Sequence, residues 1–198
     1  MAEIYKVGQC PVFKEAGDIK LTTPYGAKIP DYPTKGKTGD HWGCDIVRST
    51  DGKNSTTATI TAIADGVIYA QRKWVKGFDD SVSAGNCVYI RHADGTETKY
   101  MHLKYGTMPD WIKDNAPVRK GDVLGYMGST GNSYGAHLHF QVEVNKKTVD
   151  PLPYLLGEKV IGAKYGVKLS EKYDTEAEAQ KVAEALNTLG IKSEVEKA

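Results

Sequence analysis

The chain has 198 residues, of which 40% are hydrophobic and 26% are charged, and its formal net charge is +1. This composition is that of an ordinary globular protein, long enough to bury one moderate core without disulfide bonds. The near-neutral charge provides no cationic surface for nucleic acid, and the sequence has no run of about 18 apolar residues that could cross a membrane. We therefore expect neither nucleic acid nor a membrane among its partners.

The N-terminal segment, MAEIYKVGQCPVFKEAG, has no basic region followed by an apolar stretch, so the sequence predicts no secretory signal peptide. Residues 1 to about 40 are rich in Gly, Pro, Thr and Lys, which predicts loops with short strands. Cys10, Cys44 and Cys87 lack the spacing of a disulfide framework or a CxxC motif. We expect reduced thiols that behave as small hydrophobes, in a protein made in a reducing compartment.

From about residue 45 to residue 149 the pattern predicts short β-strands. Residues 87–92 and 96–102 flank the Asp94-Gly95 turn and predict a β-hairpin. Many short strands at close spacing predict a mainly β, antiparallel fold of sandwich or barrel type. The expected strands cover residues 46–47, 57–64, 67–70, 88–91, 96–101, 123–127 and 138–144.

Two longer stretches, residues 74–85 and 104–116, interrupt these strands. The first contains Trp74 and Phe78, and the second contains Tyr105 and Trp111. Long loops on a β scaffold often carry binding residues, although a plain surface loop explains them equally well.

Near Gly157 the pattern changes, and we divide the chain into a main domain, residues 1–157, and a small β-α-β unit, residues 158–198. Strands are predicted at 165–169 and 191–195. Between them, Thr175 and Glu178 match a helix capping box, and apolar residues follow at helical spacing. Because this unit is too small to bury a core securely, we expect it to dock on the main domain or to pair with a second copy of itself.

Histidine and aspartate lie four residues apart in the segment His41-Trp42-Gly43-Cys44-Asp45. This spacing can aim both side chains at one point, and both are ordinary zinc ligands. A pair on the surface is the simple alternative. Cys44 could compete for a metal, but on a strand it points away from Asp45, so we assign it to the core.

The segment His137-Leu138-His139-Phe140 continues to Val144 with strict alternation. The apolar side chains share one face, which belongs to the core, and the two histidines share the opposite, more open face. This arrangement suits one metal ligand beside one catalytic group. The alternative is a surface strand with two solvated histidines.

Two further histidines lie at the predicted hairpin. His102 stands at its end, and His92, beside the Asp94-Gly95 turn, is predicted to be structural. Taken together, one aspartate and four histidines in one β domain can form a catalytic zinc site, which needs three protein ligands and an open position for water. Zinc lowers the pKa of its water to about 7, and a spare imidazole can accept a proton or stabilise an oxyanion.

These motifs resemble, in their order, those of the M23 family of metallopeptidases, which are lysostaphin-like or LytM-type peptidoglycan endopeptidases. The resemblance covers residues 18–153. It implies that His41, Asp45 and His139 bind Zn2+, that His102 and His137 are catalytic, and that the substrate is a peptide bond in the cross-links or stem peptides of bacterial peptidoglycan. The matching segments are Lys20 to Gly26, His41-x-Gly43-x-Asp45, residues 64–68, residues 121–125, Gly128-Ser129-Thr130-Gly131 and residues 137–140.

The chain departs from the family pattern at two positions beside the last strand. Ala136 replaces the usual proline, and Tyr134 replaces a small residue. The C-terminal unit resembles half of a SPOR-type repeat, which binds glycan strands, although docking or dimerisation explains it equally well. Without a predicted signal peptide, the chain resembles a bacteriophage endolysin, which would accumulate in the host cytoplasm before lysis.

Two other functions are compatible with the same motifs. One is a binding or regulatory protein with an M23-like fold and no catalysis, which the five filled site positions disfavour. The other is a structural zinc site, which would need a fourth protein ligand, and the sequence offers no obvious candidate near the motifs.

Overall fold

The computed structural model describes residues 2–30, 38–52 and 55–162, and four positions of the C-terminal region. The chain divides into two compact units, residues 1–162 and 163–198. In the second unit, Ala177, Gln180, Lys181 and Glu184 are helical and exposed, which agrees with the helix predicted there. The two strands predicted in this unit lie outside the described residues, so the SPOR-like and dimerisation assignments stay predictions. No helix in the described part of the chain is long and apolar enough to cross a membrane.

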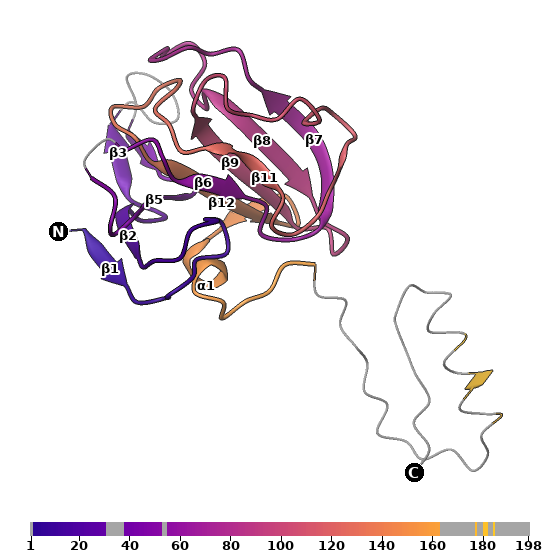
Figure 1. Ribbon diagram of the computed structural model, residues 1–198. Coiled ribbons are helices and arrows are strands. Elements are labelled where there is room, and N and C mark those ends of the chain that lie inside the picture. The colour runs from indigo at the N-terminus through magenta and orange to yellow at the C-terminus, as the bar shows by residue number, and fades with distance from the viewer. Residues whose placement is uncertain are drawn as a thin grey trace. The chain divides into compact units, whose positions relative to one another are not determined.

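The described part of the first unit is built on a nine-stranded antiparallel sheet (Figure 1). Its strand order is β1-β2-β5-β12-β9-β8-β7-β10, and β13 pairs with β12. The strands are β1 (Glu3–Tyr5), β2 (Ile19–Thr23), β5 (Cys44–Arg48), β7 (Gly66–Arg72), β8 (Asn86–Arg91), β9 (Glu97–Leu103), β10 (Pro117–Val118), β12 (Leu138–Val144) and β13 (Lys147–Val149). The predicted mainly β, antiparallel fold is confirmed.

Two short strand pairs and one helix complete the described elements. β3 (Lys28–Pro30) pairs with β4 (Thr38–Asp40), and β6 (Thr59–Thr61) pairs with β11 (Val123–Tyr126). Figure 1 shows β6 and β11 lying across one face of the large sheet. The helix α1 (Leu152–Leu155) follows β13 and buries Tyr154 and Leu155.

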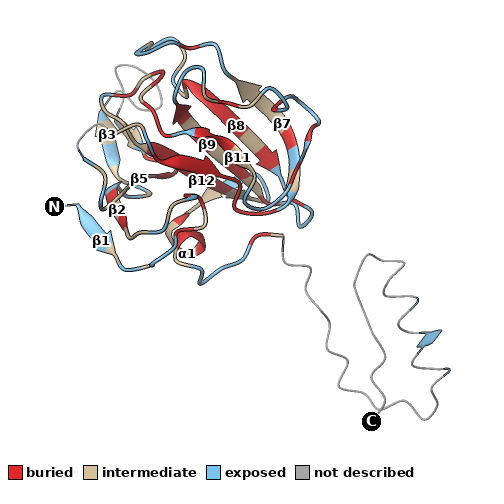
Figure 2. Cartoon of the chain, in the orientation of Figure 1, coloured by how far each residue is buried: buried red, intermediate tan, exposed pale blue. Residues whose placement is uncertain are grey.

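The hydrophobic core joins this face of the large sheet to β6 and β11. Phe140 of β12, Ile46 of β5 and Ile90 of β8 are fully buried, as are Ile60 of β6 and Leu124 of β11. Figure 2 shows how burial concentrates in the central strands of the sheet. Burying this apolar surface, at roughly 25 cal/mol per Å2, is the main force that holds the strands in register.

The alternation predicted for residues 138–144 is confirmed. Leu138, Phe140 and Val142 are fully buried in the core. The opposite face is less open than predicted, because His139 and Gln141 are only 4% and 3% exposed. Loops cover that face near the middle of the sheet, and this covering creates the pocket described below.

The predicted hairpin is also confirmed, since β8 and β9 pair as antiparallel neighbours through the turn at Asp94-Gly95. In the described part of residues 1–162, the other predicted strands are also present; the strand at 138–144 has the predicted ends and the rest have shifted ends. The largest difference is at residues 57–64, where the strand is limited to Thr59–Thr61. Beyond it the chain turns, and the amide of Ile63 donates to the hydroxyl of Tyr100.

Candidate metal centre and active site

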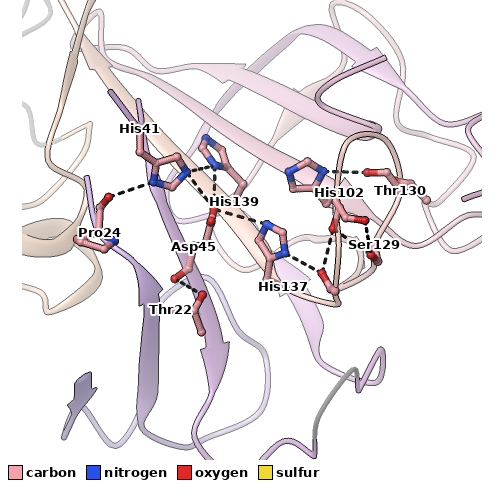
Figure 3. Close-up of polar contacts among 11 residues, drawn as sticks. Thr22, Pro24, His41, Asp45, His102, Ser129, Thr130, His137 and His139 are labelled. Carbon is pink, nitrogen blue, oxygen red and sulfur yellow. Dashed lines mark hydrogen bonds and ion pairs between the residues drawn. The ribbon is translucent and has the colours of Figure 1, made fainter. Parts of the chain in front are cut away.

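Five of the residues singled out in the sequence lie together in one pocket of about 830 Å3. His41 precedes β5, Asp45 lies on β5, His139 lies on β12, His137 precedes β12 and His102 lies on β9 (Figure 3). The sheet order places β5, β12 and β9 side by side, so segments nearly 100 residues apart in the chain meet at one point.

Three of these side chains form a compact set of potential metal ligands. His41 Nε2 lies 2.9 Å from His139 Nδ1, and Asp45 Oδ1 lies 2.9 Å from His139 Nδ1 and 3.2 Å from His41 Nε2. Ligands at the usual zinc distances stand roughly 3.3 Å apart around a tetrahedral ion. The spacing of the three atoms therefore fits a small divalent cation.

The hydrogen bonds around these three side chains show which of their atoms can present a lone pair to a metal ion. His41 Nδ1 lies 3.1 Å from the carbonyl of Pro24, and because a carbonyl only accepts, Nδ1 carries the proton and Nε2 presents a lone pair to the centre. With His139 protonated on Nδ1, that one proton faces both His41 Nε2 and Asp45 Oδ1. His139 Nε2 is buried and has no hydrogen-bond partner among the described residues. A cation bound by His41 Nε2, Asp45 Oδ1 and His139 Nδ1 would replace the shared proton, and the ring proton of His139 would then stand on Nε2.

The charge state of Asp45 also suits a cation. Burial raises the pKa of its carboxyl, but hydrogen bonds from His139 and His41 outweigh that effect and hold the pKa well below its usual value. Burial lowers the pKa of His139, so its imidazole is neutral at pH 7. An ionised carboxylate and neutral imidazoles are the forms that bind zinc.

The close packing at Gly43 explains why the metal motif contains a glycine. A Cβ built on Gly43 would lie 2.5 Å from the carbonyl oxygen of Phe140 and 2.7 Å from His139 Nε2. The backbone of the motif thus packs directly against the strand that carries His139. Any side chain at this position would push that ligand away from the centre.

His102 and His137 are oriented in the same way. His102 Nδ1 donates to the carbonyl of Thr130 at 2.8 Å, and His137 Nδ1 donates to the carbonyl of Gly135 at 2.8 Å. Each ring therefore keeps its Nε2 for the pocket, and His137 Nε2 lies 3.5 Å from Asp45 Oδ1. The centroids of the two rings are 4.8 Å apart. Two imidazoles beside a cation site can exchange protons with a substrate and stabilise a developing oxyanion.

His102 is held in a strained backbone conformation. Its φ is +63°, in the left-handed region that residues with a Cβ rarely adopt. Such strain costs on the order of 1–3 kcal/mol and is typical of functional positions. Burial and the neighbouring imidazoles of His137 and His139 lower the pKa of His102 to about 3. Its ring is therefore neutral at physiological pH and able to accept a proton.

Sequence reasoning missed the residues that hold His102 in place. Thr130 Oγ1 donates to the carbonyl of Leu103 at 2.8 Å and accepts from the amide of Asn86 at 2.9 Å. The fully buried Asn86 side chain bonds both backbone groups of Val75, at 2.8 Å each. The glycine-rich segment 128–131 is a visible signal for this support. Its role as the anchor of His102 depends on tertiary contacts that the sequence does not reveal.

One of the two long loops borders the pocket. Phe78 forms a bridge with Gly131, and Ser83 and Ala84 line the pocket. The ring of Phe78 lies 5.4 Å from that of Tyr134, which lines the same pocket and is 91% exposed. The second loop, residues 104–116, does not contribute to the lining among the described residues.

The remaining candidates occupy structural positions. Cys44 is buried in the core, where burial raises the pKa of its thiol well above the usual value, and it lies outside the group of described residues that could hold a metal. Cys10 and Cys87 are likewise buried free thiols, as predicted. His92 is buried, with Nδ1 2.7 Å from the Asp65 carbonyl and Nε2 2.8 Å from Thr98 Oγ1. These contacts agree with the structural role expected for it.

The larger unit of the chain is similar to known peptidases. Residues 40–151 match peptidase family M23. The DD-carboxypeptidase/endopeptidase Mpg of Neisseria meningitidis serogroup B is 40% identical over 97 residues, which cover 49% of this chain and 20% of the relative. The peptidoglycan DD-endopeptidase ShyC of Vibrio cholerae serotype O1 is 32% identical over 114 residues, covering 58% of this chain and 22% of the relative.

A third relative is named as an activator of hydrolases rather than as a peptidase. The murein hydrolase activator NlpD of Salmonella dublin is 33% identical over 127 residues, covering 63% of this chain and 30% of the relative. Among solved structures, a zinc-containing peptidase from Vibrio cholerae matches with a TM-score of 0.52 and 25% identity, over 74% of this chain and 39% of that one. This chain spans between 20% and 30% of the length of the three relatives.

Proposed function

We propose that this chain, which belongs to peptidase family M23, is a zinc-dependent endopeptidase that hydrolyses peptide bonds in bacterial peptidoglycan. The observation that carries the proposal is the convergence of His41, Asp45 and His139 on one point, with His102 and His137 beside it in the same pocket. The names of Mpg and ShyC, which describe endopeptidases, support the reaction class.

In this proposal His41 Nε2, Asp45 Oδ1 and His139 Nδ1 hold the ion. When bound, zinc supplies Lewis acidity toward the scissile carbonyl and a lowered pKa for water. His102 and His137 perform the proton transfers. Both present Nε2 to the pocket, since both Nδ1 atoms are committed to backbone carbonyls. One ring, neutral, accepts the proton of the attacking water at Nε2, and the other, protonated at Nε2 as an imidazolium, donates to the developing oxyanion.

Metal analysis combined with mutation tests the proposal. The purified chain should bind one zinc ion and release peptides from cell walls. His139→Ala should lose zinc and activity together. His102→Ala and His137→Ala should keep the zinc and lose turnover by about 100- to 10,000-fold. Wall digestion by the His102→Ala variant at the parent rate would contradict the proposed chemistry.

A regulatory function without catalysis is the second candidate, because one relative is named as a hydrolase activator. The pocket disfavours it for this chain. All five positions are filled, and the strained backbone of His102 is maintained with its ring oriented by Thr130. A purely regulatory surface would have no use for that strain. The same zinc-loaded protein, assayed on purified walls without any other hydrolase, separates the two functions.

The finer assignments rest on sequence patterns and need their own tests. A phage endolysin role predicts accumulation in the host cytoplasm and lysis only after the membrane is permeabilised. Binding to glycan strands or dimerisation through residues 158–198 predicts that removing them changes wall binding or the mass in solution. The three relatives compared above are bacterial proteins and offer no support for the phage role.

A further inference from the structure

The face of the sheet opposite the core carries a second group of charged side chains next to the metal centre. Along β12 from His139, this face presents Gln141 and then Glu143. The strand registers place Gln141 opposite Lys99 of β9, and Lys99 opposite Tyr89 of β8. Gln141 and Tyr89 line the pocket that contains the metal centre. Lys99 and Glu143 therefore lie on the sheet surface that forms the floor of the pocket, immediately beyond Gln141 and Tyr89.

Two ion pairs occupy this floor, and they differ in how completely they are satisfied. Arg91 donates to Glu97 Oε1 at 2.9 Å, and the Tyr69 hydroxyl also hydrogen-bonds Glu97. The carboxylate of Glu97 is thus compensated by both Arg91 and Tyr69. In the second pair, Lys99 donates to Glu143, and the contact is made through the Oε1 atom of the carboxylate alone. The two glutamates stand directly opposite each other across β12 and β9, an arrangement that is unfavourable unless each carboxylate is compensated.

The hydrogen-bond inventory of the second pair is incomplete. Glu143 Oε1 accepts from Lys99 and, at 2.7 Å, from Gln141 Nε2, whereas Oε2 accepts no hydrogen bond from the described residues. An ammonium group has three donors, and Lys99 uses one of them on Glu143 while the Tyr89 ring lies 5.3 Å away. Both side chains are 16% exposed. The pair thus offers a ligand two N–H donors and one carboxylate oxygen.

The position of the pair fits a substrate group close to the scissile bond. Met101 lies opposite His139, and Lys99 is two residues further along β9. Two residues of a strand span about 7 Å. An extended peptide advances by roughly 3.3–3.6 Å per residue. A substrate residue two positions from the bond at the metal centre would therefore lie above Lys99 and Tyr89.

We propose that Lys99 and Glu143 bind the zwitterionic end of a diamino acid in the substrate, two residues from the scissile bond. This proposal rests on the proposed function. Within a peptide, the main-chain amines and carboxylates are consumed in peptide bonds. A diamino dicarboxylic acid such as diaminopimelate keeps a free ammonium and a free carboxylate on one carbon of its side chain. The ammonium donates to Glu143 Oε2 and the carboxylate accepts from Lys99, and both bonds are charge-assisted.

A matched pair of substrates tests this subsite in the zinc-loaded full chain. One cross-linked stem peptide carries free diaminopimelate, and the other carries the same residue amidated at the side-chain carboxyl. The measured quantity is the ratio of kcat/KM for the two peptides. We expect the parent to prefer the free carboxylate by about tenfold or more. Lys99→Met should bring the ratio near one, while Lys99→Arg should retain most of it. Glu143→Gln should lower kcat/KM for both peptides and leave the ratio largely unchanged, because both peptides keep the ammonium that Glu143 binds.

Lys6→Met is the control variant, since it removes the lysine of an ion pair with Asp18 that lies outside the pocket lining. Its ratio should equal that of the parent. A variant that fails to fold is recognised by loss of zinc and of the thermal transition, and Lys99→Arg then decides the result. Equal kcat/KM of the parent for both peptides, or an unchanged ratio in Lys99→Met, would overturn the proposal.

Binding of an uncleaved stem tetrapeptide, followed by calorimetry, separates this inference from the proposed function. If the parent binds the free form at least tenfold more tightly than the amidated form, and Lys99→Met does not, the subsite stands even where cross-linked peptides are not cleaved. If the parent cleaves cross-linked peptides but neither binds nor cleaves the free form preferentially, the proposed function stands and the subsite is wrong.

Discussion

Replacing Gly43 with alanine should loosen the metal centre without touching a ligand. The added Cβ would lie 2.5 Å from the carbonyl oxygen of Phe140, and ordinary contact begins at 3.4 Å, so about 0.9 Å must open between β5 and β12. The Phe140 oxygen is backbone and cannot swing aside. The same Cβ would lie 2.7 Å from His139 Nε2 and would displace that ring from Asp45.

The cost can be estimated from these contacts. Overpacking of this kind destabilises a fold by about 1–3 kcal/mol. Disturbing the support of a metal ligand lowers metal affinity by about 10- to 100-fold. We therefore expect Gly43→Ala to lower both the free energy of unfolding and the zinc affinity, and to lower wall hydrolysis at limiting zinc.

Zinc affinity is measured by competition with a chromogenic chelator, and stability by urea unfolding of the metal-free protein. Gly52→Ala is the control, because a Cβ at Gly52 would meet nothing within 4 Å. Its free energy of unfolding should stay within about 0.5 kcal/mol of the parent. If Gly43→Ala bound zinc as tightly as Gly52→Ala, the account of the glycine in this motif would be refuted.

Three further outcomes are expected. Asn86→Ala should destabilise the fold by about 1–3 kcal/mol for each buried backbone group of Val75 that it leaves unpaired. It should also lower kcat by misplacing His102. An unchanged free energy of urea unfolding would contradict this expectation. Burial lowers the pKa of His92 below its usual 6.5, so the unfolded chain binds the extra proton and the free energy of unfolding should decrease as the pH falls below about 6.5. In urea titrations of the metal-free protein from pH 8 to pH 4, His92→Gln should show a shallower decrease, and an identical slope would count against the assignment. Asp45→Asn should abolish stoichiometric zinc binding, measured by atomic absorption after dialysis, and full retention of zinc would argue for another ligand set.

The local pattern of the chain is enough to predict the strands and several properties of the site. Alternation is a property of a strand's own side chains, and it assigns Leu138 and Phe140 to one face and His137 and His139 to the other. The same alternation places Cys44 in the core, and the Asp94-Gly95 turn signal places the turn of the hairpin. The order of the motifs along the chain is sufficient to indicate the M23 family, which the match over residues 40–151 confirms.

Other features depend on how strands distant in the chain pair, and no local pattern contains that information. His139 meets Asp45 because β12 lies beside β5 in a register fixed by packing over the whole core. The carbonyls of Pro24, Thr130 and Gly135 choose which nitrogen each histidine presents, and a backbone carbonyl has no sequence signature. The ion pair of Lys99 and Glu143 arises in the same way, from strands that become neighbours only in the folded sheet. The sequence by itself thus determined which side chains could bind metal and transfer protons. Only the tertiary structure decided that they meet, because register between distant strands is set by burial of the core as a whole.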